Sequence, residues 1–230
     1  MYIDELLKEE IDYNKVLTLF FLDNFNYEYR KYTDNEREQS TNRLINILEY
    51  VSTDNIIKLI DSNKDKIKDI NPGNIPQFSN LSSINDVLDF VSVAENTTYE
   101  LIGYYINKDS KKGAQMKYGE NHYKIAALMG LVTLQKPFEV TDLGKRYMML
   151  TEEEKLVVRN KLFLQIPIVQ ILLTSAISDR VNGMDVLRKY LSESTSIRRR
   201  SNLKNIINCI CENIEDIELN VRIMTNIEWK

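Results

Sequence analysis

The sequence predicts a mainly α-helical protein whose β structure is limited to a few short strands. The chain of 230 residues contains only 7 glycines and 4 prolines, while 43% of it is hydrophobic, a balance typical of a folded helical protein. Apolar residues recur at spacings of three and four through most of the chain, and alternating runs are short and few. A chain of this length can hold two or three small units, each with its own core.

The first predicted unit covers residues 1–78 and is helical. Apolar residues follow helical spacing over residues 3–21. An aromatic cluster follows, interpreted as packing residues, with a base-stacking surface as the alternative: Phe25, Tyr27, Tyr29 and Tyr32. Further helices are expected over residues 42–51 and, capped within Ser52-Thr53-Asp54, up to residue 60. Two of the four prolines, Pro72 and Pro76, then interrupt the pattern and mark a boundary.

The second predicted unit covers residues 79–165. Its first two helices are expected to begin at Ser82 and after a cap at Thr97 or Thr98. A third helix is expected over residues 115–129 and ends at Gly130. A hairpin of residues 132–134 and 138–140 follows, and then a helix capped by Thr141. Three helices followed by a small hairpin are the order of a winged helix-turn-helix unit.

The third predicted unit covers residues 166–230 and repeats this order. The helical stretch of residues 152–176 is interrupted by Pro167, and helices are expected over residues 184–191 and 194–214. Residues 217–223 alternate apolar and polar side chains, so they are expected to form a wing strand. The predicted fold is therefore two tandem winged helix-turn-helix units with small β wings, preceded by a helical N-terminal region.

The charge of the chain is unevenly distributed. A formal net charge of −4 argues against a protein that grips nucleic acid by a bulk positive field, so any contact must be local. Residues 1–12 hold five acidic residues and one lysine, whereas seven basic residues lie between Arg180 and Lys204, with only Asp185 and Glu193 against them. The basic segment is therefore the first indication of a nucleic-acid partner.

Two motifs resemble a known family. The first combines Gly119, Tyr123 and Ala126 with the turn Met129-Gly130-Leu131-Val132, and continues into Phe138-Glu139-Val140-Thr141-Asp142-Leu143-Gly144. The second contains Gln165-Ile166-Pro167-Ile168 and the pattern Ser192-x-x-Thr195-x-x-Arg198-Arg199. Together these motifs resemble the winged-helix DNA-binding domains of type II restriction endonucleases and restriction-associated proteins. The resemblance covers residues 83–214 and departs from the pattern at Ile207 and Ile210, near where the family often has a tryptophan.

The resemblance implies that two helices enter the major groove of duplex DNA. Such a helix needs a polar outer face that reaches base edges and phosphates. The candidate DNA-binding residues are Lys111, Lys112, Gln115, Lys117, Tyr118, Asn121, His122, Lys124, Lys136, Thr195, Arg198, Arg199, Arg200 and Lys204. Alternatives stay open: His122 as a packing or solvated histidine, the Lys111 region as a solvated turn, and the arginines as ion-pair partners of the acidic N-terminal segment.

No catalytic residue, metal ligand or cofactor site is expected. The chain has one histidine, and Cys209 and Cys211 lie two apart on one predicted helix, where they point away from each other as reduced thiols. With no apolar run long enough to span a bilayer and no basic leader followed by an apolar stretch, a cytoplasmic location without a membrane partner is expected.

The expected function is sequence-specific binding of double-stranded DNA, as the recognition component or a regulator of a restriction-modification or related defence system. A nuclease subunit or a second copy of the chain is the further partner considered. One alternative is a magnesium-dependent endonuclease with an unrecognised catalytic centre, for which Asp109-x-Lys111 is the nearest triplet. The other is a winged-helix module that binds protein.

Overall fold

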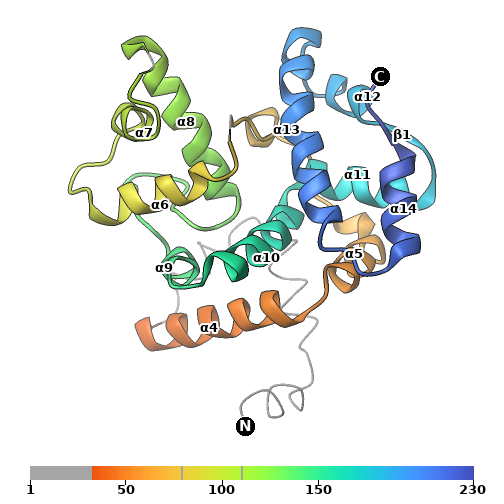
Figure 1. Ribbon diagram of the computed structural model, residues 1–230, viewed down its shortest axis with the longest axis horizontal. Helices are drawn as coiled ribbons and strands as arrows, with labels where there is room; N and C mark the ends of the chain where they lie inside the picture. The colour runs from red at the N-terminus through yellow and green to blue at the C-terminus, as the bar shows by residue number, and fades with distance from the viewer. Residues whose placement is uncertain (1–32, 79, 110) are drawn as a thin grey trace.

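The computed structural model describes residues 33–78, 80–109 and 111–230. The expectations for residues 3–32, including the aromatic cluster, lie outside this part. The prediction of a mainly helical protein is confirmed (Figure 1). The helices are α4 (Asp34–Tyr50), α5 (Thr53–Asp61), α6 (Ser83–Val93), α7 (Tyr99–Ile106), α8 (Lys112–Leu128), α9 (Asp142–Met148), α10 (Glu152–Leu162), α11 (Pro167–Ser178), α12 (Gly183–Arg188), α13 (Glu193–Cys211) and α14 (Ile217–Asn226), with short 3-10 turns η1 (Lys64–Lys66), η2 (Pro72–Asn74) and η3 (Phe163–Gln165).

Side-chain caps begin several of these helices where the sequence predicts them. The Ser52 hydroxyl accepts from the Asn55 backbone N–H, and Thr98 and Thr141 cap α7 and α9 in the same way. Just before α10, the N-cap residue Thr151 forms a reciprocal capping box with Glu154. By contrast, α13 begins at Glu193 without a side-chain cap and ends at Cys211, whereas the sequence predicts residues 194–214.

The turn after α8 takes the form that its glycine predicts. Gly130 has φ of 77°, and its N–H donates to Ala127 O while the Leu131 N–H donates to Ala126 O, both at 3.0 Å. The predicted hairpin follows as a short antiparallel pairing centred on Val132 and Val140, not as two full strands. This pairing returns the chain directly into α9.

The wing strand predicted over residues 217–223 is wrong, because this segment forms α14. Its apolar residues alternate as in a strand, but only Leu219 and Ile223, one helical turn apart, are buried. Asp216 caps the helix by accepting from the Leu219 N–H at 3.0 Å. The one sheet among the described residues is a parallel pair, β1 (Val181–Asn182) and β2 (Ile227–Glu228), so the expectation that all sheets are wing hairpins is also wrong.

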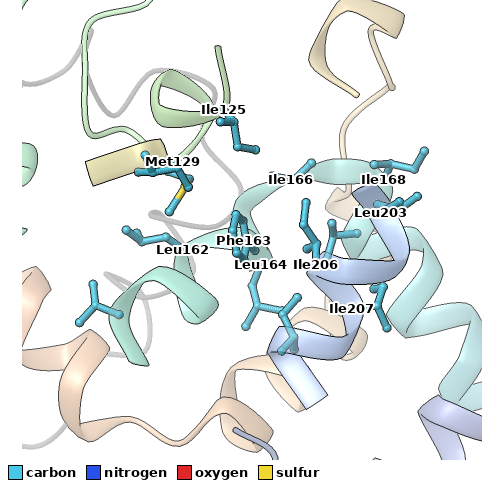
Figure 2. Packing of buried hydrophobic residues seen from close by; sticks show 14 of the residues in the cluster. Ile125, Met129, Leu162, Phe163, Leu164, Ile166, Ile168, Leu203, Ile206 and Ile207 are labelled. Atoms are coloured by element: carbon cyan, nitrogen blue, oxygen red, sulfur yellow. The ribbon is translucent and has the colours of Figure 1, made fainter. Parts of the chain in front are cut away.

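One continuous hydrophobic core extends from α4 to the C-terminus. In Figure 2, Phe163 of η3 lies between Met129, the residue that follows α8, on one side and Ile206 of α13 on the other. The N-terminal helices join the same core, since α4 packs on α9 and α10, and α5 packs on α11. Buried Lys161 donates from Nζ to Glu49 O of α4 at 3.2 Å, and burial lowers the pKa of this lysine to about 8.

The N-terminal helices are also tied to the C-terminal ones by polar contacts. The buried carboxylate of Asp54 on α5 accepts from the backbone N–H groups of Glu215 and Asp216, at 3.3 and 2.9 Å. Lys58 forms an ion pair with Asp216 at 3.0 Å. The segments on either side of the boundaries proposed at residues 78 and 165 therefore contribute to one hydrophobic core.

Candidate nucleic-acid interface

The position of α8 is fixed by a close crossing with α7. A Cβ on Gly103 would lie 1.9 Å from Gln115 O, and a Cβ on Gly119 would lie 1.8 Å from Tyr99 O. Only glycine allows two backbones to approach this closely. The crossing turns one face of α8 inward and leaves the opposite face to solvent.

Two of the candidate residues on α8 belong to its inner face. Gln115 and His122 are buried, contrary to the expectation that both face outward. His122 Nδ1 lies 2.8 Å from Tyr118 O, and burial lowers the pKa of its imidazole. The two residues share the i, i+4, i+7 stripe of Gly119 and Tyr123, and that periodicity is the signal that could have placed them inside.

The exposed lysines of α8 are held by one acidic residue. Glu120 accepts from Lys117 Nζ at 2.7 Å and from Lys124 Nζ at 2.6 Å. These hydrogen bonds hold the pKa of Glu120 below its usual range, so the carboxylate is ionised at neutral pH. The expected outward position of both lysines is therefore observed, but half of their charge is neutralised.

The other candidates around α8 lie at its edge or in the adjoining loops. Tyr118 is half-buried and stacks on His122, and Asn121 is half-buried. Lys111 is exposed just before α8, and Lys112 begins the helix, although its side chain is outside the described part. Lys136 is exposed in the hairpin loop, with Nζ 5.8 Å from the centre of the Phe138 ring.

The second candidate helix, α13, has distinct inner and outer faces. Its inner face carries buried Leu203, Ile206, Ile207 and Ile210. Exposed Arg198 lies at one edge of the solvent-facing side, and exposed Arg200 and Lys204 lie toward the other edge. None of the three pairs with a carboxylate in the part of the chain that the structure describes. Unlike the lysines on α8, these cations have no acidic partner within residues 33–78, 80–109 and 111–230.

A small polar network orders the start of α13. Arg198 Nη2 donates to the Thr195 hydroxyl at 3.2 Å, and Ser192 Oγ donates to the same hydroxyl at 3.0 Å. Arg198 therefore lies near the positive end of the helix dipole, where an anion is favoured. Thr195 is half-buried and orients the arginine.

Arg199 differs from its neighbours and lies on the inner side of α13. Its Nη1 donates to Ile75 O, in the segment between η2 and α6, and burial lowers the pKa of its guanidinium. The expectation that Arg199 faces DNA is therefore not supported by its position. The alternative pairing of the arginines with residues 1–12 involves residues outside the described part.

The two acidic residues within residues 180–204, Asp185 and Glu193, are both paired with one arginine. Arg188 on α12 pairs with Asp185 at 3.0 Å and with Glu193 through two nitrogens at 2.6 and 2.9 Å. One arginine thus binds both carboxylates of residues 180–204. The remaining cations of the segment therefore determine its local charge.

Three polar residues of the outer face were not predicted from the sequence. Ser194, Ser201 and Asn205 are exposed at i−4, i+3 and i+7 from Arg198. That spacing places them on the same side of the helix as Arg198. Helical periodicity counted from the arginine would have identified them.

Neither the acidic residues nor the cysteines of the described part assemble into a metal site. Among these residues, no group of three or more His, Cys, Asp or Glu is placed to hold an ion. Asp109 and Lys111 are exposed beside the turn between α7 and α8. Cys209 and Cys211 are free thiols, and burial raises the pKa of both, that of Cys211 to about 12.

Comparisons with protein-family models, with curated proteins and with solved structures each found no match to this chain. In the described part, no single helix is both long and apolar enough to cross a membrane. The stretches Glu152–Gln165 and Pro167–Ser178 meet that test only as a pair, and they are bent by 86°.

Proposed function

We propose that this protein binds double-stranded DNA sequence-specifically through α13, as the recognition component or a regulator of a restriction-modification or related defence system. In this proposal, the segments of residues 79–165 and 166–230 act as two winged-helix-like reading units. The second lacks an antiparallel wing, so its reading depends on the helix alone.

The outer face of α13 is the observation that carries the proposal. Arg198, Arg200 and Lys204 are exposed on a chain of net negative charge and have no carboxylate partner among the described residues, and hydroxyl and amide side chains lie close to Arg198 along the helix. Arginine makes bidentate contacts with guanine or phosphate, while serine and asparagine hydrogen-bond to base edges and phosphates. The solvent-facing side of α13 therefore offers both cationic and hydrogen-bonding groups to duplex DNA.

The test is binding of the full chain to a random pool of duplex DNA, followed by selection of the bound sequences at several salt concentrations. Arg198→Ala combined with Arg200→Ala should weaken binding and lower the salt slope of log K by about 0.9 for each phosphate that the variant no longer neutralises. An arginine that reads guanine should also relax specificity at one position, at a cost of about 1–3 kcal/mol.

The control removes the same charge elsewhere. Lys64 and Lys66 are exposed in η1, so Lys64→Ala with Lys66→Ala should leave both affinity and selectivity nearly unchanged. Equal effects of the two double variants would mean that only the total charge matters. Enrichment of no sequence, together with unaltered binding in the arginine variant, would contradict the proposal.

A further inference from the structure

The segment that precedes the first reading unit is fastened to the inner face of α13. We call residues Ile75–Phe78 the strap. The side-chain amide of Asn202, oriented so that both of its polar atoms are satisfied, donates to Phe78 O at 3.0 Å and accepts from Phe78 N at 3.1 Å. Arg199 binds Ile75 O three residues earlier. Both ends of the strap are thus held by side chains of one helix.

Burial makes these hydrogen bonds hard to exchange for water. Ile75 and Phe78 are 1% and 7% exposed, and Asn202 is 8% exposed. A buried backbone N–H or carbonyl that loses its partner costs about 1–3 kcal/mol. The strap is therefore held by polar groups that must stay paired, in addition to its apolar contacts.

The strap is the second of two attachments between the reading units. The first attachment is the shared core, where Asn160 of α10 donates to Cys209 O of α13 at 2.9 Å and where Figure 2 shows Phe163 close to Ile206. In Figure 1, the strap segment lies between α13 and α6, so it joins the units at a different place. Two separate attachments restrict the motion of one unit against the other more than either attachment would alone.

We infer that Asn202 and Arg199 are positioning residues that fix α8 and α13 at one separation, so that the protein contacts two tracts of duplex DNA at a fixed spacing. The contact with DNA rests on the proposed function. The fixed separation of the two helices does not depend on it. The outer face of α13 contacts DNA, and its inner face sets the distance to the other contact.

The separation can be measured without DNA. Spin labels at Lys117→Cys and Lys204→Cys, both exposed positions, report the distance between the helices in a Cys209→Ser, Cys211→Ala background. Asn202→Ala should broaden the distribution of distances between the labels. Asn55→Ala, an exposed asparagine on α5, is the matched control and should not. An unchanged distribution in a folded Asn202→Ala protein would overturn the inference.

The spacing is then measured on DNA. With a selected site, insertion of one to three base pairs between the two protected tracts should weaken wild-type binding by about tenfold or more, the cost of one disrupted tract. In Asn202→Ala, the same insertion should change the affinity by a factor close to one. If Asn202→Ala does not fold, Arg199→Lys provides the second variant, with Arg222→Lys on the exposed surface of α14 as its control.

The outcomes separate the two claims. No duplex binding, with label distances that broaden as expected, contradicts the proposed function but supports the fixed separation. Binding with only one protected tract, or with the full insertion penalty in Asn202→Ala, overturns the spacing role. Recovery of the penalty in Asn202→Gln would show that the amide acts through its hydrogen bonds, because a general loss of packing would not be rescued by a longer side chain.

Discussion

At the scale of single residues, Glu120 controls how much positive charge α8 presents to solvent. Its carboxylate binds Lys117 and Lys124 and is itself largely shielded, with a side chain 19% exposed. Such a carboxylate competes with phosphate for the same two ammonium groups. The affinity of α8 for an anion therefore depends on a residue that would itself repel DNA.

Replacing this residue should strengthen DNA binding. Glu120→Gln removes the negative charge and leaves two lysines free, so we expect higher affinity and a salt slope steeper by up to about two, if both lysines reach phosphates. Titration of labelled duplex against salt concentration measures both quantities.

Glu153→Gln is the matched control for this prediction. Glu153 is exposed in the first turn of α10, and its replacement changes net charge by the same amount. If the two variants bind equally, bulk charge explains the effect. If Glu120→Gln binds like the wild type, α8 does not face DNA.

The residue types of the interface could be predicted from the sequence, but their direction often could not. Arg198 and Arg199 are adjacent and chemically identical, yet one faces solvent and the other binds Ile75 O. The strap partner lies 124 positions earlier in the chain, and no local pattern reveals it. Similarly, polar His122 was expected outside but lies inside because α7 and α8 cross at glycines.

At the scale of elements, capping residues made the starts of helices predictable. Short apolar runs did not show whether a segment forms a helix or a strand. Thr98, Thr141 and Thr151 each begin a helix through a local hydrogen bond, and such signals depend on three or four neighbouring residues. The segment of α14 was different because its alternation fits a strand as well as a helix. Its packing against α11, and the bond from Asn226 to Ala176 O fifty positions earlier, are long-range contacts.

The crossing of α7 and α8 gives a sharp prediction for two glycines of one helix. Gly119→Ala would place a methyl group 1.8 Å from Tyr99 O and 2.6 Å from Gly103 N, so the helices must separate. We expect a loss of about 2 kcal/mol or more in the free energy of unfolding, measured by denaturant titration.

Gly113→Ala tests the opposite case on α8. A Cβ at Gly113 would meet nothing within 4 Å, so the substitution should raise the free energy of unfolding by about 0.5–1 kcal/mol through helix propensity. A destabilisation of similar size in both variants would mean that general helix effects, and not the crossing, explain the result.

At the scale of the whole molecule, the continuous core bears on whether the proposed units can act independently. Phe163 and its neighbours join residues from α8 and α13, and Asp54 joins α5 to the start of α14. Units that share a core unfold together, because exposing one half leaves the other with an uncovered apolar face. This coupling is what a fixed spacing between two reading helices requires.

The single tryptophan allows this coupling to be measured. Trp229 lies at the C-terminus, where its ring packs close to Gly183, so its fluorescence reports the C-terminal unit alone. Leu88 of α6 is 1% exposed and lies in the other unit. Leu88→Ala should cost about 2–5 kcal/mol by leaving a cavity, which lowers the midpoint of thermal unfolding by roughly 5–15 °C.

Cooperative unfolding predicts that Leu88→Ala lowers the Trp229 fluorescence midpoint and the circular dichroism midpoint by the same amount. Val93→Ala, on the same helix but 81% exposed, should move neither midpoint appreciably. If the fluorescence midpoint stays at its wild-type value while the dichroism signal divides into two transitions, the segments 79–165 and 166–230 unfold independently. Their boundary would then be a flexible joint, and the two reading helices could not maintain one spacing through the core.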